Sequence, residues 1–273
     1  MKVSVIIAFY NKIDFLKKVL AGFENQVFRD FELVIADDGS KASVVEALND
    51  YMQNSSLKIQ HIWHEDQGWR KNMILNKAIV ASNGEYIIFI DGDCIPHRYF
   101  IQDHFKLREP GVLLAGRRVR LSDKISKSLS NDKIRTGWLD KHIYTTIFLD
   151  SLFGKTIQVE KGIRLAFLNN KVKRGYPIRD VLGCNFSVHK EELLAINGFD
   201  ERYAGPGVGE DTDIDLRYEN AGYEVKLLRY SAVQYHIWHP TVPRSTHSKN
   251  MEIYHENKKN QVSDTPYGIV ASK

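Results

Sequence analysis

The feature that most constrains this chain is an unbroken apolar run that ends in two closely spaced carboxylates. Residues 86–90 read Tyr-Ile-Ile-Phe-Ile, and Asp91, Gly92 and Asp93 follow directly. A run of this length, with β-branched and aromatic residues, predicts a strand that is buried on both faces. Two carboxylates at the edge of a core repel each other and are poorly solvated unless a cation binds them. The run therefore predicts either a divalent metal site at the carboxyl end of a central strand or an ordinary Asp-Gly turn.

Residues 1–95 alternate between strand patterns and helix patterns. Apolar runs at Val3–Phe9 and Phe31–Ala36 predict two further strands, and helical periodicity follows each of them. Such alternation implies parallel strands with right-handed crossovers, and ligands bind beyond the carboxyl ends of these strands. Polar or acidic residues follow all three long strands, and this coincidence favours the metal site over the turn: Tyr10 and Asn11, Asp37 and Asp38, and Asp91 with Asp93.

We therefore predict an α/β fold with a Rossmann-like, mostly parallel central sheet that is flanked by helices. A chain of 273 residues is long enough for one such domain with an appendage. The first strand is not followed by Gly-x-Gly-x-x-Gly, which argues against a dinucleotide-binding domain. The sequence also has no phosphate loop of the Gly-x-x-x-x-Gly-Lys-Ser/Thr type.

Residues 117–180 differ from the rest of the chain in charge. They contain fifteen Lys or Arg residues but only six Asp or Glu residues, and large apolar side chains lie between them. We expect a basic helical insert on the main sheet. One interpretation is a set of solvated helix faces around a small core, and the other is a surface that meets an anionic acceptor or membrane headgroups.

A second acidic cluster, at residues 210–215, begins a predicted helix. Its four carboxylates are Glu210, Asp211, Asp213 and Asp215. A helix dipole stabilises acidic residues in its first turn, but four carboxylates exceed what capping needs. One of them, facing a cleft, would serve as a general base.

Composition indicates which compartment and partners to expect. Cys94 and Cys184 are too few for a disulfide framework, and we predict reduced thiols in a cytoplasmic protein. No stretch approaches the roughly 20 apolar residues of a membrane span, and the apolar run at the amino terminus is too short for a signal peptide. Any contact with the inner face of the membrane would be peripheral, through the basic insert. A net charge of only +4 and an acidic cleft argue against nucleic acid as a partner.

Several short motifs, in this order, resemble those of family 2 glycosyltransferases of the GT-A fold. They are Asp-Asp-Gly-Ser at 37–40, Asp-x-Asp at 91–93, Gly-Phe-Asp at 198–200 and Gly-Glu-Asp at 209–211. Each motif is weak alone, but their order and spacing together are specific. The later half is similar to galactosyl- and hexosaminyl-transferases, including chondroitin-polymerase-type domains. The resemblance covers about residues 1–115 and 180–240, most of the chain except the basic insert.

The resemblance implies a division of the chain into one catalytic domain and a tail. Residues 1–240 would form the GT-A domain, with a nucleotide-binding half at 1–115, the basic insert at 117–180 and an acceptor half at 181–240. Residues 241–273 would form a lid and a tail that is weakly structured from about Asn257.

The resemblance also implies a role for each site residue. Asp38 would read the uracil edge, and the nucleotide would contact Phe9, Tyr10, Asn11, Asp38, Arg70, Asn72, Asp91 and Gly92. Asp93 and His236 would bind Mn²⁺ or Mg²⁺, with Asp91 and His239 as further candidates. A lone histidine at the end of a strand is more often a packed core residue, but the resemblance favours His236 as a ligand, and His239 would replace it or bind phosphate. Asp211 would deprotonate the acceptor hydroxyl, and Glu210 would bind the acceptor or the donor sugar.

The function implied by this resemblance is inverting, metal-dependent sugar transfer. The donor would be a UDP-sugar that carries a hexose or N-acetylhexosamine, and the acceptor a glycan or a lipid-linked saccharide in bacterial surface polysaccharide or lipopolysaccharide synthesis. Two alternatives remain. A non-catalytic nucleotide-sugar-binding module would lack the Gly-Glu-Asp carboxylates, and a nucleotidyltransferase would carry a glycine-rich basic loop after the first strand.

Overall fold

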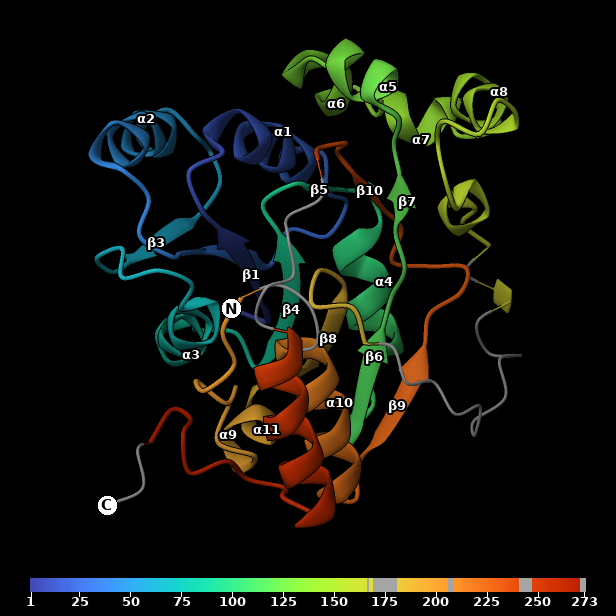
Figure 1. Cartoon of the computed structure of the whole chain (residues 1–273). Coiled ribbons are helices and arrows are strands. Elements are labelled where there is room, and N and C mark those ends of the chain that lie inside the picture. The colour runs from blue at the N-terminus through green and yellow to red at the C-terminus, as the bar shows by residue number, and fades with distance from the viewer. Residues whose placement is uncertain (166, 169–180, 206–208, 241–246, 271–273) are drawn as a thin grey trace.

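The computed structural model describes residues 1–165, 167–168, 181–205, 209–240 and 247–270. Within them, a seven-stranded sheet with the order β3-β2-β1-β4-β8-β6-β9 has helices on both faces (Figure 1). Its parallel half consists of β3 (Ile59–Trp63), β2 (Phe31–Asp37), β1 (Val3–Phe9) and β4 (Tyr86–Asp91). β8 (Phe186–His189) runs antiparallel to β4 and to β6 (Val112–Ala115), and β9 (Glu224–Leu227) is parallel to β6. The predicted mostly parallel α/β sheet is confirmed.

Alternate residues of β1 supply the two cores that hold helices on the sheet. Val5 and Ile7 pack on the side of α1 (Ile13–Glu24), α2 (Ala42–Gln53) and α4 (Phe100–Leu107). Ile6 packs on the other side, with α3 (Lys71–Ala81), α9 (Lys190–Ala195) and α10 (Glu210–Asn220). Successive side chains of a strand point to opposite faces, so an uninterrupted apolar run is what a doubly covered strand requires.

A smaller three-stranded sheet brings late residues of the chain next to the end of β4. It consists of β5 (Cys94–Pro96), β10 (Gln234–His236) and β7 (Val119–Arg120). β10 pairs antiparallel with β5, which sets His236 opposite Cys94. It also pairs in parallel with β7, which sets His236 opposite Arg120. His236 therefore lies opposite the residue that follows Asp93 in the chain.

The basic segment folds mainly as short helices beside α1, and its helical character is as predicted for residues 117–165 and 167–168 (Figure 1). Residues 169–180 lie outside the described part of the chain. Apolar side chains such as Ile134, Leu139 and Ile147 are buried and join the core on the α1 side. The elements are α5 (Asp123–Ser128), α6 (Asn131–Arg135), α7 (Trp138–His142), α8 (Thr146–Leu152) and the 3₁₀ helix η1 (Val159–Gly162).

The expectation of a weakly structured tail from about Asn257 is wrong for residues 257–270. Helix α11 (His247–Lys259) packs beside α10, and the buried Asn257 donates through Nδ2 to Asp213 Oδ1 at 2.8 Å. The buried Thr265 hydroxyl donates to Asp200 Oδ2 at 2.9 Å. These polar side chains anchor the tail to α10 and to the turn after α9, although its sequence is hydrophilic. Residues 241–246 of the expected lid lie outside the described residues.

Among the described helices, none combines the length and the apolar character that crossing a bilayer requires.

Candidate active site

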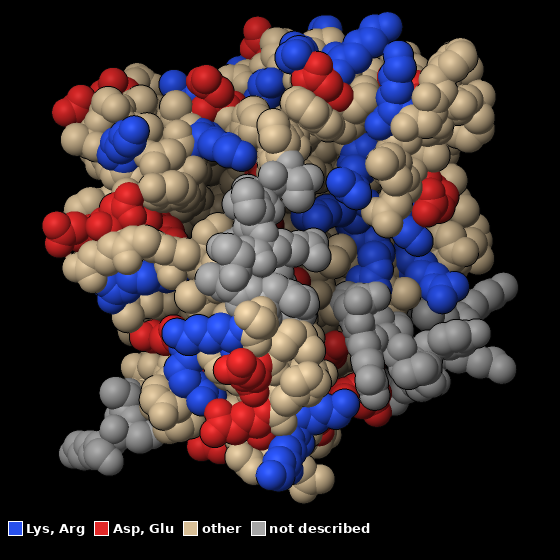
Figure 2. Space-filling view, viewed as in Figure 1, with Lys and Arg blue, Asp and Glu red and all other residues tan. Residues whose placement is uncertain are grey.

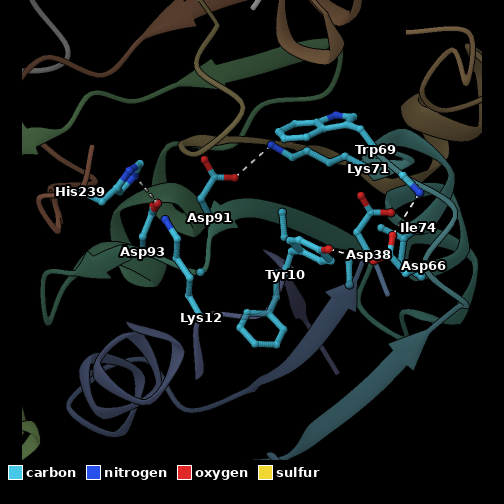
Figure 3. A pocket seen from close by; sticks show the side chains of 15 residues that line it. Tyr10, Lys12, Asp38, Asp66, Trp69, Lys71, Ile74, Asp91, Asp93 and His239 are labelled. Carbon is cyan, nitrogen blue, oxygen red and sulfur yellow. Dashed lines mark hydrogen bonds and ion pairs between the residues drawn. The ribbon is translucent and has the colours of Figure 1, made fainter. Parts of the chain in front are cut away.

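A cavity of about 360 Å³ lies at the carboxyl ends of β1, β2 and β4 (Figure 3). Asp93 and His239 lie at one end of the cavity, and Asp38 and Asp66 lie at the other. Asp91 lies between the two ends. The lining residues are Ala8, Phe9, Tyr10, Lys12, Ala36, Asp38, Asp66, Gly68, Trp69, Lys71, Ile74, Asp91, Gly92, Asp93 and His239.

The close approach of β4 to β1 fixes where the two carboxylates of the Asp-x-Asp motif lie. The N–H of Gly92 donates to the carbonyl oxygen of Ala8 at 2.8 Å. A Cβ atom at Gly92 would lie 3.1 Å from that oxygen and 3.3 Å from Phe9 Cδ2, which is tighter than ordinary contact. A glycine here lets the chain turn directly against β1, so that Asp91 and Asp93 both face the cavity.

Asp93 meets two histidines that follow it by more than 140 residues in the chain. His239 Nε2 lies 3.0 Å from Asp93 Oδ2, and His236 Nε2 lies 3.6 Å from Asp93 Oδ1. One ligand atom from each of the three residues lies within 4.8 Å of the other two. His239 is the nearer and lines the cavity, whereas the sequence ranked His236 first.

The charges and donor types of this cluster fit a divalent transition metal. Burial opposes ionisation of Asp93, yet the hydrogen bond from His239 and the neighbouring His236 hold the pKa of that carboxyl well below its usual range. Burial lowers the pKa of His236 to about 4, so this imidazole is neutral, the form that binds metals. The hydrogen bond to Asp93 raises the pKa of His239. One carboxylate oxygen with two imidazole nitrogens suits Mn²⁺ better than Mg²⁺.

Lys71 contacts the other carboxylate of the motif. Its Nζ lies 3.1 Å from Asp91 Oδ1, near the middle of the cavity (Figure 3). Lys71 stands one helical turn before Ile74 in α3, and both residues line the cavity. This spacing puts them on one face of the helix. The ammonium group of Lys71 therefore lies between the two ends of the cavity, beside Asp91.

At the other end, Asp38 is held from two sides. His64 Nε2 lies 2.8 Å from Asp38 Oδ1, and the Arg70 backbone N–H donates to Asp38 Oδ2 at 3.0 Å. Burial raises the pKa of Asp38 above its usual range, although both hydrogen bonds oppose this shift. A buried carboxylate with fixed orientation is suited to accept a hydrogen bond from a ligand.

Two exposed aromatic rings flank this end of the cavity. Tyr10 is 48% exposed and Trp69 is 42% exposed, and both side chains line the cavity (Figure 3). The Tyr10 hydroxyl donates to Asp66 Oδ2 at 2.9 Å, which orients its ring. Aromatic faces on the wall of a cavity are suited to stack against a planar ligand.

Three of the residues predicted to contact the nucleotide have side chains directed elsewhere. Asn72 is buried and donates through Nδ2 to the Asp200 carbonyl at 2.6 Å, so it connects α3 to the turn after α9. The Arg70 guanidinium contacts Gln67 and Met73, and only its backbone N–H reaches Asp38. Asn11 accepts the Lys41 N–H at 3.0 Å, which ties the ends of β1 and β2 together. None of the three lines the cavity.

The carboxylate proposed as a base lies outside this cavity, at the start of α10. Asp211 Oδ2 accepts the Gly183 N–H at 3.2 Å, and its Oδ1 accepts the Thr212 N–H at 2.8 Å. The next residue, Cys184, lies near Cys94, and Cys94 follows Asp93. Gly183 and Cys184 therefore lie between Asp211 and the cluster of Asp93, His236 and His239. The side chain of Glu210 lies outside the described part of the chain.

Asp213 explains part of the acidic cluster without any role in a site. It is buried, and its Oδ2 accepts the Arg217 Nε–H at 2.6 Å within α10. The Tyr203 hydroxyl donates to its Oδ1 at 3.0 Å.

Four polar residues that lie in or beside the cavity were not among the predicted site residues: Lys12, His64, Asp66 and Lys71. His64 directly follows β3, so the same rule about carboxyl strand ends would have found it. The helical spacing between Lys71 and the inward-facing Ile74 would have indicated Lys71.

Two family models cover most of the chain. The model for glycosyl transferase family 2 matches residues 4–168, and the model for the N-terminal domain of galactosyltransferase matches residues 164–240. The chain belongs to glycosyl transferase family 2. The predicted resemblance is confirmed, and the protein is a glycosyltransferase.

A curated relative supports the same assignment. Chondroitin synthase of Escherichia coli is 27% identical over 241 residues, which are 85% of this chain but 34% of that protein. The glycosyltransferase chain thus spans about a third of the length of this relative.

Solved structures show the same GT-A fold. The mannosyltransferase PcManGT of Pyrobaculum calidifontis, in complex with GDP-Man and Mn²⁺, has a TM-score of 0.59 at 18% identity. The alignment covers 95% of this chain and 62% of that one. S. aureus TarS 1–349 in complex with UDP has a TM-score of 0.51 at 16% identity, with 96% of this chain and 68% of that one covered.

Proposed function

We propose that this glycosyltransferase moves a hexose or N-acetylhexosamine from a UDP-sugar to a glycan or lipid-linked saccharide, with inversion and with a divalent metal. The acceptor would belong to bacterial surface polysaccharide or lipopolysaccharide synthesis. The relative named chondroitin synthase supports a polysaccharide product, and the complex of TarS with UDP supports the donor class.

The observation that carries the proposal is the two-ended cavity. One end holds Asp38, a buried hydrogen-bond acceptor, beside the exposed rings of Tyr10 and Trp69. This arrangement suits a planar base that carries an N–H group. The other end holds the cluster of Asp93 and His239. A nucleotide diphosphate requires both environments, a flat pocket for the base and a cation for the diphosphate.

Asp93, His236 and His239 would hold the metal. When bound, a divalent cation would act as a Lewis acid that neutralises the charge developing on the departing UDP. Lys71 and Lys12 line the same cavity and add positive charge to it. Asp91 would steady the ribose or the metal-bound water, and its contact with Lys71 at 3.1 Å fixes its orientation.

Asp211 would take the proton from the acceptor hydroxyl. That oxygen would then form a bond to the anomeric carbon as the bond from this carbon to the diphosphate oxygen breaks on the opposite side, which inverts the configuration. Glu210 would bind the acceptor or the donor sugar. The Gly183 and Thr212 N–H groups hold Asp211 at the start of α10, where its carboxylate is oriented before the acceptor binds.

We also propose that the insert contacts a membrane surface peripherally. Eight of the seventeen large hydrophobic side chains that are exposed in the described residues lie between residues 144 and 167. Phe153 is 78% exposed and Leu152 is 65% exposed, at the end of α8. Figure 2 shows Lys and Arg side chains over the neighbouring helices α5 and α6. Apolar side chains with lysines around them are typical of interfacial segments.

Calorimetry of UDP binding in the presence of Mn²⁺ tests the main proposal. Wild-type protein should bind UDP only with the metal, and Asp93→Ala should lose this binding. Asp123→Ala, an exposed carboxylate of α5 that pairs with Lys127, should leave it unchanged. Absence of UDP binding to the wild type would contradict the proposed donor.

A further inference from the structure

A partly buried arginine, Arg118, has no carboxylate partner in the described part of the chain and lies beside the proposed metal-binding cluster of Asp93, His236 and His239. Arg118 lies between β6 and β7, and its Nη1 donates to Cys184 Sγ at 3.2 Å. A cysteine sulfur is a weak acceptor, whereas a guanidinium has five N–H donors. Among the described residues no carboxylate lies within ion-pair distance of Arg118 or of its neighbour Arg120.

Three other arginines with restricted exposure pair with carboxylates in this protein. Arg217 donates to Asp213 at 2.6 Å and to the Ile196 and Gly198 carbonyls, both at 2.7 Å. Arg164 forms a bidentate contact with Asp103 at 2.6 and 2.8 Å, and Arg202 contacts Asp200 at 2.7 Å. A charge taken out of water is costly unless it is paired. Arg70 is also partly buried without a carboxylate, but its guanidinium contacts Gln67 and Met73. Within the residues that the structure describes, Arg118 has only a weak sulfur acceptor, which points to a ligand as its partner.

The register of the small sheet directs both arginines toward the metal-binding cluster. β7 pairs with β10 so that Arg120 lies opposite His236 and Val119 lies opposite Tyr235. Val119 and Tyr235 are fully buried. Because strand residues alternate between faces, Arg118 and Arg120 share the face of His236. Figure 2 shows a band of Lys and Arg side chains where Figure 1 draws β7.

The position of these arginines argues against the nucleotide as their partner. Neither Arg118 nor Arg120 lines the cavity that runs from Asp38 to Asp93. A divalent cation and a sugar diphosphate carry charges of equal size and opposite sign, so a bound donor adds no net negative charge beside the two guanidinium groups. Arg118 instead contacts Cys184, which neighbours the Gly183 that binds Asp211. This is the side on which the transferred sugar and the acceptor would meet.

We infer that Arg118 and Arg120 form a subsite for a carboxylate or another singly charged oxyanion of a sugar, carried by the donor or by the acceptor saccharide. This inference rests on the proposed function and narrows its substrate class to anionic sugars. Arginine presents two parallel N–H groups to a carboxylate, so the subsite would distinguish an acidic sugar from its neutral analogue.

Matched pairs of neutral and acidic sugars test the inference by calorimetry with Mn²⁺. The donor pair is UDP-glucose and UDP-glucuronate, and the acceptor pair is methyl β-glucoside and methyl β-glucuronide added to protein loaded with UDP. In one pair the wild type should prefer the acidic member by about tenfold. A preference in the donor pair places the charge on the donor sugar, and a preference in the acceptor pair places it on the acceptor.

Arg118→Gln and Arg120→Gln should each remove this preference, while the exposed control Arg29→Gln should keep it. Arg120 is exposed, so its variant decides the question if Arg118→Gln does not fold. No preference in either pair, or a preference that survives both variants, would overturn the inference. An equal loss of UDP and of every sugar would also overturn it, because Arg118 would then contact the diphosphate. Failure of the wild type to bind UDP at all is a separate result, which contradicts the proposed function.

Discussion

His239 Nε2 lies 3.0 Å from Asp93 Oδ2, although 146 positions separate the two residues in the chain. The pairing of β10 with β5 brings them together, because it sets His236 opposite Cys94 and leaves His239 to turn back over Asp93. The contact joins the nucleotide half of the sheet to the later half, so metal binding at Asp93 would depend on both.

Loss of His239 should weaken Mn²⁺ binding more than loss of His236. His239 is the closer to Asp93 and lines the cavity, so we expect His239→Ala to lower Mn²⁺ affinity by at least about tenfold. Electron paramagnetic resonance of free Mn²⁺ measures this without nucleotide. His255→Ala, an exposed histidine of α11, is the control, and equal affinities for all variants would exclude the histidines as ligands.

Asp211→Asn should separate binding from transfer. The amide oxygen can still accept the Gly183 N–H, although the Thr212 N–H loses its acceptor, so the side chain should stay near its place at the start of α10. We expect UDP-sugar affinity to remain and the rate of transfer to fall on the order of 10²–10⁴-fold, as for loss of a general base. Product formation from a labelled donor is the readout, with Asp123→Asn as the control. Undiminished transfer by Asp211→Asn would reject the base assignment and leave the donor site untouched.

Replacement of the exposed apolar side chains of the insert should weaken binding to anionic vesicles. We expect the wild type to sediment with phosphatidylglycerol vesicles more than with phosphatidylcholine vesicles, and less in high salt. Leu152→Ser with Phe153→Ser should reduce partitioning by about tenfold, since two large side chains no longer enter the interface. Val80→Ser, 57% exposed and outside the insert, is the matched control. Equal sedimentation of the three proteins would refute the membrane contact.

Stability should fall as the pH decreases from 7.5 to 5. Burial lowers the pKa of His97 and of His104 to about 3. The unfolded chain protonates these residues near pH 6.5 while the folded chain keeps them neutral, so their contribution is complete above pH 6.5 and is lost as the pH falls. Each histidine contributes about 1.4 kcal/mol per pH unit within this window. Denaturant titrations in the presence of a chelator measure the change.

Asp140 acts in the opposite direction over part of this range. Burial raises its pKa to about 6, so its stabilising contribution is present at low pH and is lost as the pH rises through 6. Asp140→Asn should therefore make the decline between pH 6 and 5 steeper. A stability that does not change with pH in either protein would contradict the burial of neutral His104, whose ring nitrogens contact Ser187 Oγ at 2.7 Å and Asn185 Oδ1 at 3.0 Å.

The sequence predicted the cavity where a general rule of parallel sheets applies. Phe9, Tyr10, Asp38, Asp91 and Asp93 all follow or end strands, and the carboxyl ends of neighbouring parallel strands meet at one edge. The rule needs only the strands and their direction. The apolar runs predict the strands, and the alternation with helices predicts that they are parallel.

The rule does not extend to side chains on helices, where the direction of each residue decides its role. Arg70, Lys71 and Asn72 are consecutive, but only Lys71 lines the cavity, and Asn72 is buried against Asp200. The mutual position of β5, β7 and β10 is likewise invisible in the sequence, because it depends on pairing between segments more than 100 residues apart. The position of Arg118 beside His236 depends on this strand pairing, so the sequence alone did not indicate it.

The anchored tail bears on where this enzyme can be shortened. The family match ends at residue 240, yet residues 247–270 supply hydrogen bonds to two buried carboxylates, Asp213 and Asp200. A truncated chain ending at residue 240 would leave these oxygens short of donors and uncover one side of the helix that carries Asp211. The minimal folding unit for expression and for crystallisation should therefore extend to residue 270.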